Sequence, residues 1–232
     1  MSIITRYEPV RSEPVGLQNG DKMSREEFHR LYKQAPKHFK AELIGGIVYV
    51  ASPLRRPHGT HHLRLGGLLA FYEGYTPGVE AGDNATVFLG DDSEPQPDLF
   101  LRVLPEFGGQ SGTNKDDYIT GAPELLIEVA HSSRSLDLHG KREDYASHGV
   151  REYLVATLSD QRMRWFDLSA SQELAADNDG IVRVRQFPGL WIHPESFFAL
   201  DFRKLMEALQ QGITSPEHAA FVDRLSKARQ TK

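Results

Sequence analysis

The chain has 232 residues, of which 39% are hydrophobic and 25% are charged, as in an ordinary globular protein with room for a sizeable core. It has no cysteine, which excludes disulfides and thiolate metal sites, and no apolar run long enough to cross a bilayer. We therefore expect a cytoplasmic protein without a membrane partner. The net charge of −5 argues against a protein that coats nucleic acid, yet an acidic enzyme that contacts nucleic acid locally stays open.

The chain begins with a segment that has no hydrophobic periodicity, so residues 1–21 are expected to form a loose arm. A helix is predicted next, from the N-cap Ser24, with Glu27 at the capping-box position, to about Gln34. Residues 41–50 then read as a β-hairpin with a glycine turn. The arm, a first helix and a hairpin therefore open the chain.

The middle of the chain alternates between helical and strand patterns. Apolar residues at helical spacing predict a helix over 58–72, and a second helix is predicted over 138–148. Short apolar runs predict strands at 79–81, at 84–89, after Asp98, around Glu128, at 150–157 and at 162–168. This order predicts an α/β fold in which helices flank a central mixed β-sheet.

Two helices are predicted at the end of the chain, over 201–211 and 216–227. We accordingly divide the chain into the arm (1–21), a main domain (22–205) and a C-terminal helical extension (206–232). The apolar residues of the extension are expected to cover an edge of the main domain or to form a homodimer.

Two acidic residues sit in strongly apolar surroundings, and they are the most informative feature of the chain. Asp98 precedes Leu99-Phe100-Leu101, and Glu128 lies inside Leu125-Leu126-Ile127-Glu128-Val129. Carboxylates on neighbouring strands are costly to bury unless a cation lies between them. Hard oxygen ligands suit Mg²⁺ or Mn²⁺, so the pair points to metal-assisted hydrolysis of a phosphodiester. A turn-forming role for Asp98 and a structural salt bridge for Glu128 are the alternatives.

Lys141 and Glu42 complete the candidate catalytic group. Asp137, Lys141 and Tyr145 are spaced by four residues, which places them on one helix face, expected to look toward the Glu128 strand. There Lys141 would position or deprotonate a water, helped by a lowered pKa, and Glu42 would assist. A solvated lysine and a Glu42–Lys40 pair are the plainer interpretations.

His58 and Arg134 are candidate substrate-binding residues, since each belongs to a cluster of basic side chains that could meet a phosphate. His58, His61 and His62 also have spacings found in zinc sites, but no matching carboxylate or further histidine follows them. We therefore do not expect zinc.

Taken together, these segments resemble the PD-(D/E)XK nuclease superfamily and, more closely, the bacterial Uma-two (Uma2) family of restriction-endonuclease-like proteins. The resemblance covers roughly residues 22–205. The supporting segments are Ala41-Glu42-Leu43-Ile44-Gly45-Gly46, Ser52-Pro53 with His58, Gln96-Pro97-Asp98, Leu126-Ile127-Glu128-Val129 with Ser132-Ser133, Asp137 with Lys141 and Tyr145, Gly149-Val150-Arg151-Glu152-Tyr153, and Phe187-Pro188-Gly189-Leu190.

The resemblance implies a metal-dependent endonuclease whose partner is nucleic acid, above all DNA, with Asp98 and Glu128 as metal ligands. One position departs from the superfamily pattern. The superfamily has a lysine two residues after the glutamate, and this chain has Ala130 there. In the resembling family this lysine comes from the next helix, where Lys141 matches. A nuclease-fold binding module without turnover, and a metal-dependent hydrolase of another phosphate ester, stay as alternatives.

Overall fold

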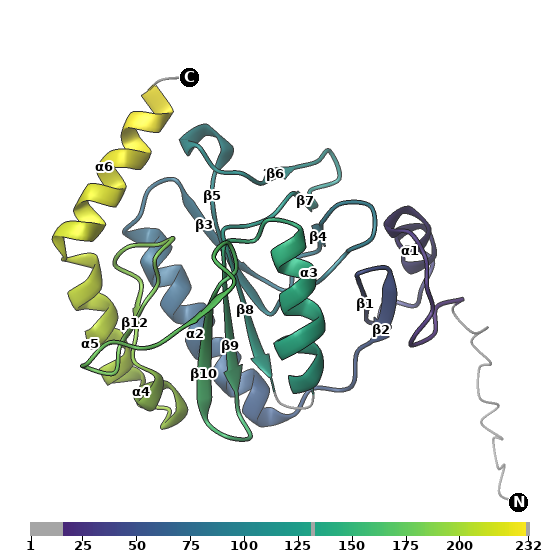
Figure 1. Ribbon diagram of the computed structural model, residues 1–232, viewed down its shortest axis with the longest axis horizontal. Helices are drawn as coiled ribbons and strands as arrows, with labels where there is room; N and C mark the ends of the chain where they lie inside the picture. Colours follow the sequence, from purple (N-terminus) through teal and green to yellow (C-terminus); the bar gives the residue numbers. More distant parts are fainter. Residues whose placement is uncertain (1–15, 131–132, 231–232) are drawn as a thin grey trace, which may run out of the picture.

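The computed structural model describes residues 16–130 and 133–230, and its centre is a six-stranded sheet (Figure 1). The strand order is β11-β10-β9-β8-β5-β3. The strands are β3 (Val79–Asp83), β5 (Leu99–Val103), β8 (Leu125–Ala130), β9 (Glu152–Thr157), β10 (Arg162–Asp167) and β11 (Gln172–Leu174). Strands β8 and β9 run parallel, whereas β5 is antiparallel to β8 and β10 is antiparallel to β9. The predicted mixed sheet is confirmed.

Helices cover one face of this sheet. The long helix α2 (Arg56–Gly74) packs against β3, β5 and β8, and α4 (Pro194–Phe198) and α5 (Phe202–Ile213) contact α2. Helix α6 (Pro216–Gln230) follows along the outer side in Figure 1. Apolar residues of α2, α5 and α6 share one core with the sheet, including Leu65, Leu69, Leu205, Leu209, Phe221 and Leu225. The boundary that we drew after residue 205 falls inside α5, and apolar residues on both sides of it belong to the same core.

The opposite face of the sheet carries a shorter helical segment. A π-helical turn, η2 (Leu136–Gly140), runs directly into α3 (Lys141–Ser147). The α3 residue Tyr145 belongs to a second core with Leu126, Tyr153 and Phe166. The predicted helix over 138–148 is therefore present, and it ends at Gly149, whose φ of +87° is a left-handed conformation that glycine adopts readily. This helix lies in front of the sheet in Figure 1.

The hairpin and the first helix form a separate small layer beside α3 in Figure 1. Strands β1 (Ala41–Ile44) and β2 (Ile47–Val50) pair antiparallel around Gly45 and Gly46, both with positive φ, as the predicted glycine turn requires. Helix α1 (Arg25–Tyr32) begins after Ser24, whose hydroxyl accepts from the Glu27 N–H. Phe28 packs with Leu43 and Val48 of the hairpin.

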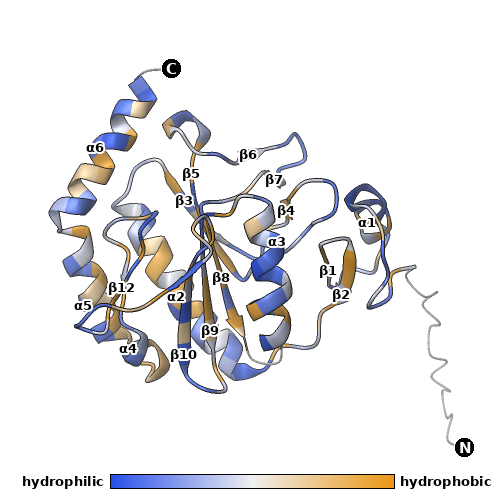
Figure 2. Ribbon diagram, in the orientation of Figure 1, coloured by the Kyte–Doolittle hydropathy of each residue, from blue (hydrophilic) through white to orange (hydrophobic). Residues whose placement is uncertain are grey.

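Shorter elements complete the fold, namely β4 (Val87–Phe88), β6 (Gly112–Thr113), β7 (Ile119–Thr120), β12 (Val182–Arg183), β13 (Trp191–Ile192) and the 3₁₀ turn η1 (Pro105–Phe107). The apolar colouring in Figure 2 concentrates on β8 and on the inner side of α2. Most of the expected N-terminal arm, and Ser132, lie outside the described residues. None of the described helices has the length and apolar character needed to cross a membrane.

Candidate functional site

The alternation of side chains along β8 determines where Glu128 points. Leu125, Ile127 and Val129 belong to the core on the α2 face, whereas Leu126 and Ala130 belong to the core on the α3 face. Successive strand residues face opposite sides, so Glu128 lies on the α3 face with Leu126 and Ala130. Its side chain is 94% buried. A carboxylate is thereby fixed on a rigid strand opposite the helix that carries Lys141.

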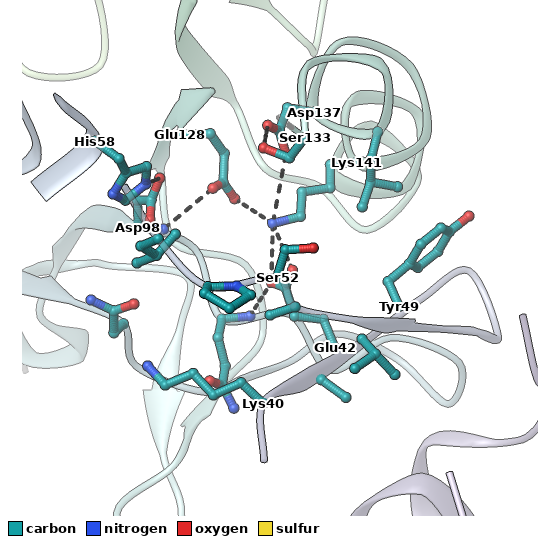
Figure 3. A pocket seen from close by; sticks show the side chains of 18 of the residues that line it. Lys40, Glu42, Tyr49, Ser52, His58, Asp98, Glu128, Ser133, Asp137 and Lys141 are labelled. Carbon is teal, nitrogen blue, oxygen red and sulfur yellow. Dashed lines mark hydrogen bonds and ion pairs between the residues drawn. The ribbon is translucent and has the colours of Figure 1, made fainter. Parts of the chain in front are cut away.

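Lys141 lies among the carboxylates at the start of α3 (Figure 3). Its Nζ is 2.8 Å from Glu128 Oε1, 2.9 Å from Glu42 Oε2 and 3.9 Å from Asp137 Oδ1. The Tyr145 hydroxyl lies 3.1 Å from the same Glu128 oxygen. Tyr145, predicted to share a helix face with Asp137 and Lys141, is therefore a direct partner of the site through its hydroxyl.

Asp98 lies immediately before β5 and faces the same group of residues. Its Oδ2 accepts the Val129 N–H at 2.7 Å and lies 3.1 Å from His58 Nε2. The Asp98 N–H lies 3.5 Å from Glu128 Oε2. Strands β5 and β8 are neighbours, so the two carboxylates that are 30 residues apart in sequence meet at one place. In the described part of the chain both contacts to the Asp98 carboxylate fall on Oδ2, which leaves Oδ1 for a cation.

Glu42 reaches this site from the hairpin, 99 residues away from Lys141 in sequence. Its Oε1 also accepts the Gln96 N–H at 2.7 Å, and this bond ties β1 to the segment leading to Asp98. The hairpin turn is in addition bound to α3, because the Gly45 N–H donates to Asp144 Oδ1 at 3.0 Å. The alternative interpretation, a Glu42–Lys40 pair, is not formed among the described residues, and Glu42 pairs with Lys141 instead.

The four carboxylates and Lys141 open onto a cavity of about 310 Å³. Asp98, Glu128, Asp137 and Lys141 line its interior, and Lys40, Ser52 and Arg55 line it from the hairpin and the following loop. Figure 3 shows Glu42 and Lys141 pointing toward one another inside this cavity, with Lys40 further away. The site is therefore accessible to a ligand.

Burial and charge act in opposite directions on the two candidate metal ligands. Burial raises the pKa of Glu128 well above its ordinary value, and Asp98, Asp137 and Glu42 raise it further against the pull of Lys141. Burial also acts to raise the pKa of Asp98, but the hydrogen bond and charge of His58 outweigh it and lower that pKa. The site holds more negative charge than its lysine neutralises, which favours a further cation.

The pKa of Lys141 corrects one expectation. Burial acts to lower it, but Glu128, Glu42 and Asp137 raise it well above the ordinary lysine value. The lowered pKa that a base needs is therefore absent, because three carboxylates surround the ammonium. In these surroundings the Lys141 side chain is held in its protonated, cationic form.

The two candidate substrate-binding residues are separated by the fold. His58, in the first turns of α2, lines the cavity and contacts Asp98. Arg134 is half-exposed, forms an ion pair with Asp160 at 3.1 Å and is not among the residues that line the cavity. His61 Nδ1 and His62 Nε2 both lie 2.8 Å from backbone carbonyls, so these two rings are engaged in the fold.

The donor set fits a small hard cation that keeps part of its water shell. The described residues contain no group of three or more His, Cys, Asp or Glu arranged as a closed metal cage. Mg²⁺ is commonly bound by one or two carboxylates together with water and substrate phosphate, and the chemistry of Asp98 and Glu128 fits that kind of donor set. Zinc, which prefers nitrogen and sulfur donors, fits poorly.

The acidic residues and Lys141 thus meet on the α3 face of the sheet, beside the neighbouring strands β5 and β8. A family model named Uma2, described as "Putative restriction endonuclease", matches residues 25–197. The chain therefore belongs to the Uma2 family. No curated protein matches the sequence.

A solved structure supports the fold. The chain is similar to a crystal structure from Anabaena variabilis described as "a putative nuclease belonging to DUF820", with a TM-score of 0.58 and 13% identity. The similarity covers 73% of this chain and 96% of that one. At this identity the match establishes the nuclease-like fold.

Proposed function

We propose that this protein is a metal-dependent endonuclease that hydrolyses phosphodiester bonds of nucleic acid, with DNA as its substrate. The observation that carries the proposal is the surplus of buried carboxylates around Lys141 at the floor of an open cavity. Such a surplus is costly to folding unless a cation offsets it. A binding site for a divalent metal and a phosphate explains why the chain retains it.

The acidic residues have distinct roles in this proposal. Asp98 and Glu128 would hold Mg²⁺ or Mn²⁺, because the two residues lie side by side at neighbouring strands and both line the cavity. When bound, such an ion stabilises charge on the reacting phosphate and acidifies a bound water. Glu42 holds Lys141 from the hairpin and assists at the site.

The remaining residues orient this group. The protonated Lys141 ammonium lies beside Glu128 and would stabilise the negative charge that develops on the phosphate oxygens. The Tyr145 hydroxyl and His58 hold Glu128 and Asp98, respectively. Ala130 lies on the same strand face as Glu128, so a lysine there would reach this site; Lys141 supplies the equivalent charge from α3.

The direct test is hydrolysis of duplex DNA with Mg²⁺ or Mn²⁺ by wild type and by Lys141→Met. We expect activity in wild type and a loss of at least about a hundredfold in the variant, the scale on which one positioned charge acts. Lys204→Met removes an exposed lysine from α5 and serves as the matched control. Equal activity of wild type and Lys141→Met would contradict the proposed role, and DNA binding without turnover would identify a binding module instead.

A further inference from the structure

Positive charge is concentrated in one continuous part of this acidic chain. Residues 28–72 contain seven lysines and arginines (Arg30, Lys33, Lys37, Lys40, Arg55, Arg56, Arg64) and a single acidic residue, Glu42. The whole chain has 27 basic and 32 acidic residues, so the remainder has 20 against 31. The segment therefore has a formal charge of +6 in a protein whose remainder has −11. Such an asymmetry favours a local contact with a polyanion.

This basic segment also builds one side of the candidate site. The segment supplies eleven of the twenty residues that line the cavity, namely residues 40–42, 49–55 and 58. The Ala51 N–H donates to the Lys40 carbonyl at 2.9 Å, so the start of β1 lies beside the loop that leads to α2. Lys40 and Arg55 are consequently both at the mouth of the cavity, whereas the carboxylates lie within it.

The cations at and near this mouth are exposed, and the described part of the chain offers them no acidic partner. Within residues 16–130 and 133–230, no carboxylate oxygen lies within 4.0 Å of the charged atoms of Lys37, Lys40, Arg55 or Arg56. The arginines of the sheet region differ, since Arg102, Arg183 and Arg185 each form an ion pair. Arginines of the sheet region thus form ion pairs, whereas the cations at the mouth have no carboxylate partner among the residues that the structure describes.

We propose that Lys40 and Arg55 bind backbone phosphates of a nucleic-acid strand that flank the bond that is cut. This inference rests on the proposed function and specifies its substrate as a strand several nucleotides long. The interior of the site is acidic and repels a phosphate at long range, so cations at the mouth are needed to hold the strand there. A small phosphodiester has no flanking phosphates and would not use both residues.

The experiment is fluorescence anisotropy of a labelled 20-base-pair DNA duplex in EDTA, which prevents hydrolysis, at salt concentrations from 50 to 200 mM. Three proteins are compared: wild type, Lys40→Gln/Arg55→Gln, and the charge-matched control Arg203→Gln/Lys204→Gln on exposed positions of α5. Each lost phosphate contact reduces the slope of log K against log salt by about 0.9. This slope does not depend on the fraction of protein that is active.

We expect the slope to fall by about 2 in the Lys40/Arg55 variant, its affinity to fall at least about tenfold, and the control to match wild type. Equal slopes in the two double variants would overturn the inference, as would a wild type that does not bind the duplex at 50 mM salt.

A second measurement separates this inference from the proposed function. Wild type is assayed with Mn²⁺ on bis(4-nitrophenyl) phosphate, a small phosphodiester. Hydrolysis of this ester, combined with equal slopes in the two variants, would leave the nuclease chemistry standing and overturn the strand-binding role. Loss of slope in the Lys40/Arg55 variant without hydrolysis of either substrate would support strand binding and contradict the nuclease.

Discussion

Two buried glutamates on adjacent parallel strands have opposite surroundings. Glu152, at the start of β9, is fully buried and its carboxylate accepts three hydrogen bonds from neutral donors. The donors are Trp165 Nε1–H at 2.7 Å, the Arg185 N–H at 3.0 Å and the Gln186 N–H at 2.5 Å. These bonds join β9 to β10 and to the segment after β12, so Glu152 has a structural role.

Glu128, on β8, is almost as buried, but charged groups surround it and a lysine is one of its direct partners. Lys141 and Tyr145 contact one of its oxygens, and Asp98, Asp137 and Glu42 add negative charge around it. Burial raises the pKa of both glutamates. Burial alone therefore does not distinguish a functional carboxylate. The distinction lies in whether the protein satisfies the charge itself or leaves a surplus beside a cavity.

The largest expected effect is a difference in the free energy of unfolding between variants of the two glutamates. Glu152→Gln places an amide against N–H donors that need an acceptor, so we expect it to lower the free energy of unfolding by about 2–3 kcal/mol. Glu128→Gln removes a surplus charge while Lys141 keeps Glu42 as a partner. We expect this variant to stay within about 1 kcal/mol of wild type or to exceed it. Urea unfolding at pH 7 measures both.

The same two isosteric variants can also contradict the distinction between a structural Glu152 and a functional Glu128. Should Glu128→Gln cost as much as Glu152→Gln, Glu128 would be a structural residue like Glu152, and the surplus-charge interpretation would be lost.

A smaller effect concerns the pH dependence of stability. Burial raises the pKa of Asp137 from 3.8 to about 6, against the opposing effects of Lys141 and Ser133. The folded state therefore binds this proton more tightly than the unfolded state, and the stability it contributes below pH 4 is lost as the pH rises through 6. Asp137→Asn should reduce the fall in unfolding free energy between pH 4 and pH 7 by on the order of 2 kcal/mol. An unchanged pH profile would show that Asp137 does not titrate as inferred.

Local patterns predicted the fold well where a single segment decides its own structure. The Gly45-Gly46 turn, the Ser24 cap and the apolar strand around Glu128 each depend on a few residues, and each is confirmed. Short elements such as α4 and β12 were not predicted as such, because two to five residues give no periodicity. Their conformation depends on contacts with the sheet and with α5.

The candidate site residues could be chosen from the sequence because acidic residues stand in strongly apolar segments. The direction of the pKa shift of Lys141 could not be predicted in this way. Lys141 and Glu42 meet across 99 residues, and only the fold shows that three carboxylates raise the pKa of the lysine instead of lowering it. Likewise, no local signal shows that Arg134 turns to Asp160 while Lys40 lines the cavity. The pKa of a side chain depends on the groups that surround it in the fold, and a single sequence does not show which groups these are.

The most direct test of the account is calorimetric titration of Mg²⁺ and Mn²⁺ into wild type, the Asp98→Asn/Glu128→Gln double variant, and Glu152→Gln as the buried control. Because Asp98 and Glu128 are the proposed ligands, we predict that wild type and Glu152→Gln bind metal and that the double variant does not. Equal binding by wild type and the double variant, or no binding of either metal by wild type at millimolar concentration, would contradict the claim that the surplus charge around Glu128 is a metal site.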